Sequence, residues 1–476
     1  MKFLLNKTKL VCTIGPASES SKILDKMILS GMNVARINFS HGDFTGHKKL
    51  IKKVRTAARK AKRRVAIMAD LPGPKMRIGQ LAEEPIELTP GNSFTLTTED
   101  IVGDNTRVSV SFSRLPKAVK KGDSLFLNDG IIELRVNKVE RKDVHCLVRV
   151  GGELRSRKGL NLPGIDLGIS AFTDRDHECL KFALEQGVDA VSQSFVETAA
   201  DIHAVREAAR KFGYQPFIIA KIERAGALDH MDDILHAADG IMVARGDLGV
   251  EIPIAKIAVV QKILMNQANR AGKPVITATQ MLESMTSTRR PTRAEATDVA
   301  NAILDGTDCV MLSGESAMGK YPVAAVSMLA QIASAVELYR PRYPLEEALK
   351  TYGRDGDITL TDLISLSVET TLERVTPAAI IVPTRSGHTA RMISRFKLPV
   401  WITAVSRHEG TCQGLAFSYG VFPVHEPEPP DDWKPFARKW LRTHKIKGNF
   451  VVLTEGPSTR HPETNNRMEL IDLSRE

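Results

Sequence analysis

The chain has 476 residues, and 66 Lys and Arg against 56 Asp and Glu give it a formal net charge of +10. Its 42% hydrophobic and 26% charged content is typical of a globular protein of roughly three domains and excludes a disordered chain. No apolar run approaches the roughly 18 residues of a membrane helix, and the N-terminal MKFLLNKTK is too short for a signal peptide. The five cysteines are too far apart for a disulfide framework, a CxxC pair or a cysteine zinc site: Cys12, Cys146, Cys179, Cys309 and Cys412. We therefore expect a soluble cytoplasmic protein.

The basic balance raises the question of a nucleic-acid partner. The densest cluster, Arg59–Arg64, precedes the apolar run Val65–Ile67, where cations complement the C-terminal dipole of a helix. Aromatic residues make up only 5% of the chain and do not alternate with this cluster. We expect neither a nucleic acid nor a membrane as partner.

Short apolar runs recur along the chain, and helical patterns follow them. Lys22–Ser30 is such a helix, capped by Ser20 or Ser21 and ended by Gly31, and Asp201–Phe212, Ile257–Ala271 and Arg293–Leu304 have the same pattern. Eight strand–helix units predict an α/β protein built on a (β/α)8 TIM barrel. The eight predicted strands are Lys9–Ile14, Asn33–Phe39, Val65–Leu71, Asp189–Phe195, Phe217–Ile222, Gly240–Ala244, Val275–Thr279 and Cys309–Leu312.

One gap interrupts this rhythm. The 118 positions from Leu71 to Asp189 exceed one crossover helix, and they contain only short strands and turns. We expect the barrel at 1–71 and 169–340, an inserted all-β lid domain at 72–168, a linker at Arg340–Pro344 and a C-terminal α/β regulatory domain at 341–476. The lid strands are expected at Ser93–Leu96, Arg107–Phe112, Ser124–Leu127, Ile131–Val136 and Val144–Val150, and the C-terminal strands at Ala379–Pro383, Val400–Val405, Val421–Val424 and Phe450–Leu453.

Active sites of (β/α)8 barrels lie at the carboxyl ends of the strands. Here those ends carry a polar set rather than an apolar rim, which favours an enzyme. The set comprises Arg36, Asn38, Ser40, His41, Asp70, Ser192, Ser194, Lys221, Glu223, Arg245, Gly246, Asp247, Thr277, Thr279, Gln280, Ser313 and Glu315.

Glu223 and Asp247 end neighbouring strands, and paired carboxylates are ligands that Mg²⁺ prefers. The alternative is a structural ion pair with Arg224 or Arg245. Lys221 lies two residues before Glu223, so both side chains project to the same side, where a fixed cation can stabilise a transferring phosphoryl group or an enolate.

Two other sites can be excluded. Gly314–Lys320 fits G-x-x-x-x-G-K, but Tyr321 stands where a P-loop needs the Ser or Thr hydroxyl that binds the Mg²⁺ of the nucleotide. The histidines form no pair at i, i+4 spacing, so a zinc hydrolase has no support.

Several motifs resemble those of the pyruvate kinase family. They are TIGPA at 13–17, 33–42, 70–77, 158–163, KIE at 221–223, MVARGDLGVE at 242–251, TATQMLESM at 277–285, PTRAE at 291–295 and 312–321. The resemblance covers the barrel and the lid, and it continues more weakly through the C-terminal domain. It implies Mg²⁺-dependent transfer of a phosphoryl group from phosphoenolpyruvate to ADP, giving pyruvate and ATP.

The resemblance also implies roles for single residues. Arg36 faces the transferring phosphate, Lys221 stabilises the transition state and the enolate, and Thr279 supports protonation of the enolate carbon. Arg245, Gly246, Asp247 and Ser194 bind substrate, and Glu223 with Asp247 binds Mg²⁺, for which Mn²⁺ is a possible substitute. The nucleotide contacts correspond to Arg77, Lys158, Asn38 and His41.

One part of the pattern departs from the family. Most members bind K⁺ at the positions of Asn38, Ser40, Asp70 and Leu71, where the last is a Thr whose hydroxyl is a ligand. Here Leu71 removes that hydroxyl, and Lys75 replaces an acidic residue. We expect the Lys75 ammonium to replace K⁺, so that K⁺ is not required; the alternative is that Lys75 points to solvent and K⁺ still binds.

The loop Thr384-Arg385-Ser386-Gly387-His388-Thr389 follows a strand and opens a helix, so it can bind a phosphate. The family binds sugar-phosphate or AMP activators at this loop and is usually a homotetramer; the alternative is a plain turn. Two other functions stay open: a metal-dependent aldolase, which also uses a Glu–Asp pair but lacks a nucleotide-binding lid, and a non-catalytic binding protein.

Overall fold

Eight parallel strands close into a barrel in the computed structural model, which describes residues 6–340, 358–456 and 466–474. The strands follow the order β1-β16-β15-β14-β13-β12-β3-β2 around the barrel, so the predicted fold class is confirmed. Their bounds are β1 Lys9–Thr13, β2 Met32–Asn38, β3 Ala66–Asp70, β12 Ala190–Gln193, β13 Phe217–Ile222, β14 Gly240–Ala244, β15 Val275–Ala278 and β16 Cys309–Leu312.

The helices form a ring outside the strands, and α1 (Ser21–Ser30) illustrates why they form where they do. The Ser20 hydroxyl accepts a hydrogen bond from Ile23 N, and Gly31 ends the helix with a φ of +127°, as the sequence predicts. The ring continues with α2 (Phe44–Ala61), α4 (Asp174–Glu185), α5 (Ala199–Lys211), α6 (Met231–Ala237), α8 (Ile257–Arg270), α9 (Arg293–Leu304) and α11 (Pro322–Val336). Shorter helices are α7 (Arg245–Glu251), α10 (Gly314–Ala317), η1 (Ala225–His230), η2 (Ile254–Lys256), η3 (Glu283–Thr286) and η4 (Glu337–Tyr339).

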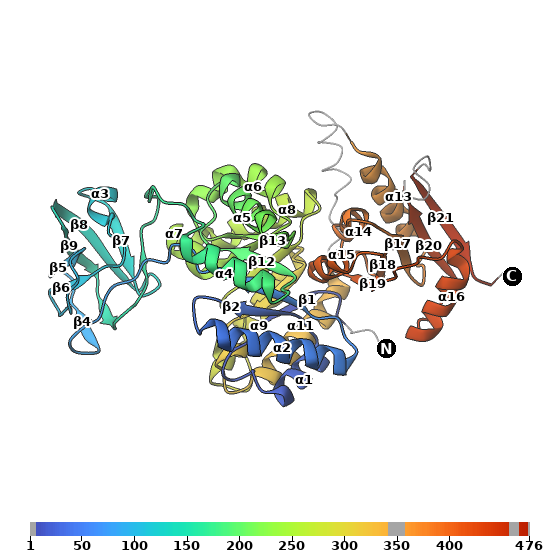
Figure 1. Cartoon of the computed structure of the whole chain (residues 1–476), viewed down its shortest axis with the longest axis horizontal. Coiled ribbons are helices and arrows are strands. Elements are labelled where there is room, and N and C mark those ends of the chain that lie inside the picture. Colours follow the sequence, from blue (N-terminus) through green and yellow to red (C-terminus); the bar gives the residue numbers. More distant parts are fainter. Residues whose placement is uncertain (1–5, 341–357, 457–465, 475–476) are drawn as a thin grey trace.

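A separate β unit lies between β3 and β12 and projects from one end of the barrel (Figure 1). Its six-stranded sheet has the order β11-β7-β8-β9-β5-β6, and β4 pairs with β10 beside it. The sequence missed the short strands β4, β10 and β11 and the one-turn helix α3 (Leu115–Ala118), so the lid is not purely β. Its strands are β4 Ile86–Leu88, β5 Ser93–Thr97, β6 Arg107–Ser109, β7 Ser124–Leu127, β8 Ile132–Glu140, β9 Asp143–Val150, β10 Gly152–Leu154 and β11 Leu160–Asn161.

The C-terminal α/β domain lies on the opposite side of the barrel from the lid (Figure 1). Its sheet has the order β19-β18-β17-β20-β21, and β21 is an antiparallel edge strand that the sequence analysis missed. Of the predicted linker, only Arg340 lies within the described residues. The elements are α13 (Leu360–Arg374), β17 (Ile380–Pro383), α14 (His388–Ser394), β18 (Ile402–Ser406), α15 (Glu409–Gly414), η5 (Leu415–Phe417), β19 (Val421–His425), α16 (Trp433–His444), β20 (Phe450–Glu455) and β21 (Arg467–Asp472).

The C-terminal domain completes the core inside the barrel. Phe417 of η5 is fully buried in the same cluster as inward-facing barrel residues such as Val11, Met242 and Met311. Its ring stacks on Phe217 at the start of β13, with centroids 5.4 Å apart. The N-terminal end of the barrel is therefore closed by a side chain from another domain.

One helical segment corrects an expectation from the sequence. Pro322–Tyr339 is long and apolar enough to pass as a membrane span on length and composition alone. In this fold its α11 portion packs between α1 and α9 and buries Leu329 and Ala333. The segment therefore occupies the position of the last barrel helix.

Candidate active site

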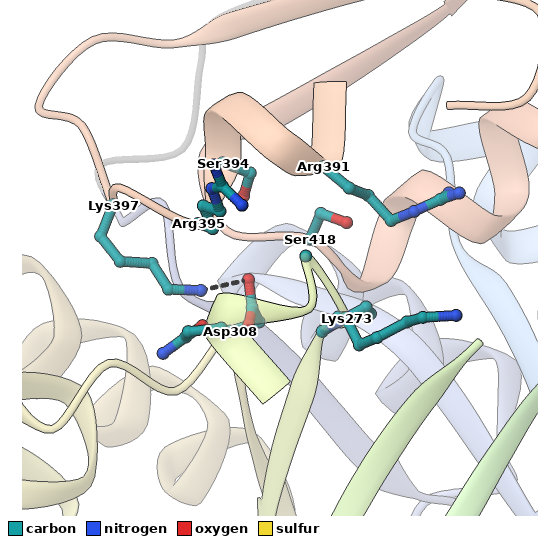
Figure 2. Close-up of a pocket in the computed structure, with 10 residues that line it drawn as sticks. Lys273, Asp308, Arg391, Ser394, Arg395, Lys397 and Ser418 are labelled. Carbon is teal, nitrogen blue, oxygen red and sulfur yellow. Dashed lines mark ion pairs between the residues drawn. The ribbon is translucent and has the colours of Figure 1, made fainter. Parts of the chain in front are cut away.

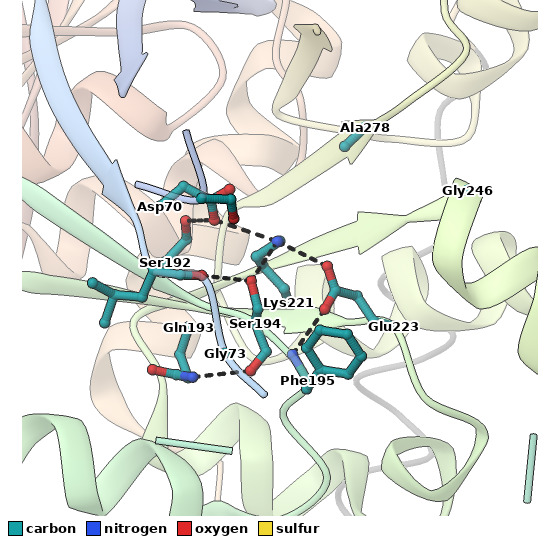
Figure 3. Close-up of polar contacts among 12 residues, drawn as sticks. Asp70, Gly73, Ser192, Gln193, Ser194, Phe195, Lys221, Glu223, Gly246 and Ala278 are labelled. Carbon is teal, nitrogen blue, oxygen red and sulfur yellow. Dashed lines mark hydrogen bonds and ion pairs between the residues drawn. The ribbon is translucent and has the colours of Figure 1, made fainter. Parts of the chain in front are cut away.

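A buried lysine stands at the centre of the polar barrel end (Figure 3). Lys221 lies in β13, and its Nζ is 2.8 Å from Glu223 Oε1, 3.4 Å from Asp70 Oδ1 and 2.6 Å from Ser194 Oγ. Burial alone lowers the pKa of Lys221, but Asp70 and Glu223 outweigh burial and raise the pKa above its ordinary value. The ammonium is thus held charged away from bulk water.

Asp70 at the end of β3 joins this lysine to Arg36 of β2. Arg36 donates to Asp70 Oδ2 through Nε, at 3.1 Å, and to Thr13 Oγ1 through Nη1, at 2.8 Å. Ser192 donates to Asp70 Oδ1 at 2.6 Å. Burial would raise the pKa of Asp70, yet Arg36 and Lys221 lower it to about 2. This carboxylate is therefore ionised and holds two cations at the mouth of the barrel.

Glu223 is oriented by the backbone and by Lys221, and not by the arginines considered from the sequence. Phe195 N donates to Glu223 Oε2 at 2.8 Å. Arg224 instead approaches Glu197 and Glu251, at 3.7 and 3.9 Å. Arg245 pairs with Asp298 at 2.8 Å. Among the described residues, neither arginine therefore pairs with Glu223 or Asp247.

Asp247 lies close enough to Glu223 to affect its titration. Burial and the negative charge of Asp247 raise the pKa of Glu223, although Lys221 opposes the change. A buried carboxylate and a half-buried one that repel each other present the hard oxygen donors that a divalent cation prefers. Within the described residues no group of three or more His, Cys, Asp or Glu side chains is arranged around a metal position. The pair fits a cation whose other ligands come from substrate and water.

The strand β15 ends in a strained backbone. Thr279 and Gln280 have φ values of 67° and 52°, a region that a β-branched residue such as Thr279 rarely adopts. Gly246 N, in the first turn of α7, donates to Thr279 Oγ1 at 2.8 Å, and Arg245 Nη2 donates to Thr279 O, also at 2.8 Å. The Gly246 amide, which the resemblance assigns to substrate binding, is therefore bonded to Thr279 in this structure.

Comparisons with known proteins identify the family of this chain. Residues 5–326 match the family described as pyruvate kinase, barrel domain, and residues 362–471 match pyruvate kinase, alpha/beta domain. Curated pyruvate kinases are similar to this chain along most of their length. The one from Thermococcus litoralis is 51% identical over 89% of each chain. Those from Geobacillus stearothermophilus and Staphylococcus aureus are 41% and 39% identical, and each match covers 98% of this chain and 80% of the relative. The chain belongs to the pyruvate kinase family. It is a phosphotransferase, and the family requires a divalent metal and uses phosphoenolpyruvate and ADP.

The residues predicted to contact the nucleotide lie where the barrel meets the lid. Arg77 pairs with Gly159 in an isolated antiparallel bridge, so Arg77 and Lys158 come from facing segments. Burial lowers the pKa of His41, and the nearby cations Arg77 and Lys75 lower it further. These groups create a positive region next to the barrel end.

The residues predicted at the K⁺ positions are Asn38, Ser40, Asp70 and Leu71. Asn38 Oδ1 accepts a hydrogen bond from Ser40 N at 3.1 Å. The Leu71 side chain is fully buried in the core, and its carbonyl oxygen accepts a hydrogen bond from Ser194 Oγ at 2.7 Å. Lys75 is exposed. Asp70, the one acidic member of this set, is already paired with Arg36.

Sequence reasoning missed some residues of this end and included others whose polar groups are used within the fold. Thr13, which holds Arg36, ends β1 and could have been found by the same strand-end rule. Gly73 was overlooked as a site residue although a Cβ there would meet Phe195 at 2.9 Å. Thr277 and Glu315 are fully buried and bond to Thr307 Oγ1 and to Leu282 N, so they support the fold.

Proposed function

We propose that the polar barrel end transfers the phosphoryl group of phosphoenolpyruvate to ADP, and that Lys221, Arg36, Glu223, Asp247 and Thr279 carry the reaction. The observation that supports these assignments most strongly is the buried Lys221 ammonium between Glu223 and Asp70, at 2.8 and 3.4 Å. Phosphoryl transfer depends on fixed charge and positioning, and this cluster supplies both.

Lys221 and Arg36 act on the transferring group. Both are cations that Asp70 fixes on its two oxygens, so substrate binding requires little reorientation of either side chain. Arg36 binds the phosphate, and Lys221 neutralises charge on the phosphoryl group and on the enolate oxygen left behind.

Glu223 and Asp247 hold the divalent cation, and we propose Mg²⁺ with Mn²⁺ as a substitute. The cation supplies charge neutralisation for the substrate when bound. Its positive charge would also oppose the burial and the repulsion by Asp247 that raise the pKa of Glu223. Ionised Glu223 then remains available to Lys221.

Residues at the start of α7 orient the substrate, and Thr279 at the end of β15 supports the final proton transfer. Backbone groups of Arg245, Gly246 and Asp247 bind the substrate carboxylate, and the Ser194 hydroxyl lies beside Lys221 on the same side. Gly246 must then exchange its bond to Thr279 for one to substrate. The strained Thr279 hydroxyl supports protonation of the enolate carbon through a bound water.

The lid supplies the nucleotide site. We propose that Arg77 and Lys158 bind the phosphates of ADP, with Asn38 and His41 on the barrel side. The domain limits are proposed as 1–71 with 169–340 for the barrel, 72–168 for the lid and 341–476 for the regulatory domain.

An assay of pyruvate formation from phosphoenolpyruvate tests this function. Purified protein with a divalent cation should form pyruvate and ATP only when ADP is present. Pyruvate released without ADP, or cleavage of a 2-keto acid aldol, would favour the aldolase. A protein that binds phosphoenolpyruvate without turnover would favour the binding protein.

We further propose that K⁺ is not required. The buried Leu71 provides no hydroxyl, and Asp70 already has two cationic partners. Activity in Na⁺ or tetramethylammonium salts should match that in K⁺, and Lys75→Glu with Leu71→Thr should create K⁺ dependence. An enzyme that is nearly inactive until K⁺ is added would contradict the proposal.

The C-terminal domain is proposed to bind a sugar-phosphate or AMP activator at Thr384-Arg385-Ser386-Gly387-His388-Thr389 in a cytoplasmic homotetramer. Burial, Arg391 and Lys273 lower the pKa of His388, so the loop lies in a positive environment. An activator should lower the KM for phosphoenolpyruvate, and Ser386→Asp should abolish this effect. Saturation curves unmoved by activators would argue against the site, and light scattering measures the oligomer.

A further inference from the structure

A small cavity lies where the C-terminal domain meets the N-terminal end of the barrel, on the side remote from the active site (Figure 2). Its volume is about 10 Å³, which is room for one water-sized particle. Both domains contribute to it, the barrel through the α8–β15 loop and the C-terminal domain through α14. The lining residues are Asn269, Gly272, Lys273, Pro274, Asp308, Arg391, Ser394, Arg395, Lys397 and Ser418.

The charge of this lining is strongly unbalanced, because four cationic side chains face a single carboxylate. That carboxylate, Asp308, is fully engaged: it pairs with Lys397 at 2.6 Å and accepts hydrogen bonds from Val275 N and Tyr419 N. Arg395 pairs with Asp362 at 2.9 Å. Within the described residues, neither Lys273 nor Arg391 forms an ion pair with a carboxylate.

Lys273 and Arg391 come from different domains, yet they extend side by side past Ser418 (Figure 2). Lys273 donates to the Ala238 carbonyl at 2.7 Å, which leaves its charge uncompensated. The charge of Asp239 acts on both cations, but Asp239 already pairs with Arg206 at 3.0 Å. Burial lowers the pKa of both cations, so neither is fully solvated. Two like charges therefore face each other across the domain boundary.

The Ser418 hydroxyl lines the same cavity, between these cations and the Lys397–Asp308 pair (Figure 2). Ser418 is 1% exposed, and its Oγ has no hydrogen-bond partner within the described residues. A buried hydroxyl without a partner is costly and therefore rare. An O–H donor at a positive cavity is the group that an anion would satisfy.

We propose that this cavity, lined by Lys273, Arg391, Ser418 and the Lys397–Asp308 pair, binds one monatomic anion, chloride in ordinary buffers. The size of the cavity favours a single atom, its charge favours an anion, and Ser418 provides a hydrogen-bond donor. The anion links the C-terminal domain to the barrel by neutralising cations from both. This inference does not depend on the catalytic assignments.

Crystals of the full chain soaked in sodium bromide test the site directly. We expect an anomalous difference peak in contact with Ser418 Oγ. A water refined in the cavity with no bromide signal would overturn the proposal, as would density for sulfate or phosphate in place of the halide when both are supplied.

Solution stability gives a test in which the sign of the effect decides. Gluconate is too large for the cavity and serves as the reference anion. At 0.2 M and equal ionic strength, the Tm in chloride should be higher than the Tm in gluconate by about 2 °C or more. Ser418→Ala should remove this gain in Tm. In gluconate, the Ser418→Ala variant should be at least as stable as the original protein, because the substitution removes an unsatisfied buried hydroxyl. Thr454→Val removes another partnerless buried hydroxyl and should keep the full chloride effect.

Lys273→Met should raise the half-saturating chloride concentration at least tenfold, whereas Lys49→Met, at an exposed lysine of α2, should not change it. Equal chloride effects in Ser418→Ala and Thr454→Val, or in the two lysine variants, would contradict the assignment. None of these residues belongs to the proposed catalytic end, so kcat at low temperature should be unchanged in all of them.

Discussion

The two ends of the barrel each bury lysine, and the two lysines behave in opposite ways. Lys221 at the carboxyl end is 8% exposed and Lys9 at the opposite end is 5% exposed. Asp70 and Glu223 raise the pKa of Lys221, whereas burial under the C-terminal domain lowers that of Lys9 to about 8. Burial is nearly equal, so the adjacent carboxylates make the difference.

The partners explain what each end does. Lys221 has two carboxylates within 3.4 Å, and the groups around it face the open mouth of the barrel. Lys9 Nζ donates to the Val421 carbonyl at 2.7 Å and lies 5.1 Å from the Trp401 ring centroid, so it is covered by the next domain. The cation at the first end faces a possible substrate, whereas the lysine at the second end makes contacts between two domains.

The largest expected effect comes from removing the charge at the open end. Lys221→Ala should lower kcat by about a thousandfold or more, because a fixed cation at the phosphoryl group is lost, while phosphoenolpyruvate affinity changes much less. Steady-state kinetics measures both. A variant that keeps more than about a tenth of kcat would end the assignment of Lys221.

Phe417, which closes the N-terminal end of the barrel, should affect stability and not catalysis. Phe417→Ala empties the bottom of the barrel and should cost about 3–5 kcal/mol in the free energy of unfolding. Phe436→Ala, at a half-buried position on α16, should cost less. Urea unfolding followed by fluorescence and circular dichroism measures both. If Phe417→Ala loses no more free energy of unfolding than Phe436→Ala, Phe417 does not hold the end of the barrel closed.

The lowered pKa of Lys9 predicts how stability depends on pH. Between pH 8 and 10.5 the unfolded chain binds a proton at this lysine that the folded chain does not, so the free energy of unfolding rises with pH. Glu337, Asp308, Cys309 and Lys7 are the titratable groups that face it. Relative to Lys9→Met, the protein should gain about 2–3 kcal/mol from pH 7 to 10. A constant difference over this range would show that Lys9 stays charged.

The carboxylate pair should give the smallest change. Glu223→Gln or Asp247→Asn should raise the Mg²⁺ concentration needed for half activity about tenfold or more, because one anionic ligand is lost. Asp233→Asn on α6 is a matched control outside the site. Metal titration of initial rates distinguishes these outcomes, and an unchanged Mg²⁺ requirement in both site variants would remove them as ligands.

The polar end of the barrel could be predicted from the sequence because a strand end is a local feature. The strands Gly240–Ala244 and Cys309–Leu312 begin and end where the sequence predicts. The polar residues that follow such buried runs indicate the polar end of the barrel. Strands such as β11, with two residues, carry no alternation to detect. The Arg245–Asp298 pair and the strain at Thr279 depend on neighbouring elements, which spacing does not reveal.

The contacts at the N-terminal end of the barrel could not be predicted from the sequence. Phe417 looks like any apolar residue of the C-terminal domain, and only docking places it inside another domain's barrel. Asp308 and Lys397 are 89 positions apart, so nothing local connects them. Contacts between domains are decided by tertiary structure, and a single sequence without relatives gives no signal for them.

The division between the two ends is tested most directly by the same substitution at both. Lys221→Met and Lys397→Met each remove an ammonium buried beside a carboxylate, and kcat and the free energy of unfolding are measured for both variants. We predict that Lys221→Met loses about a thousandfold in kcat, while Lys397→Met loses about 3–5 kcal/mol of stability and stays within about threefold of the original kcat while folded. Comparable losses of kcat in the two folded variants would contradict the account.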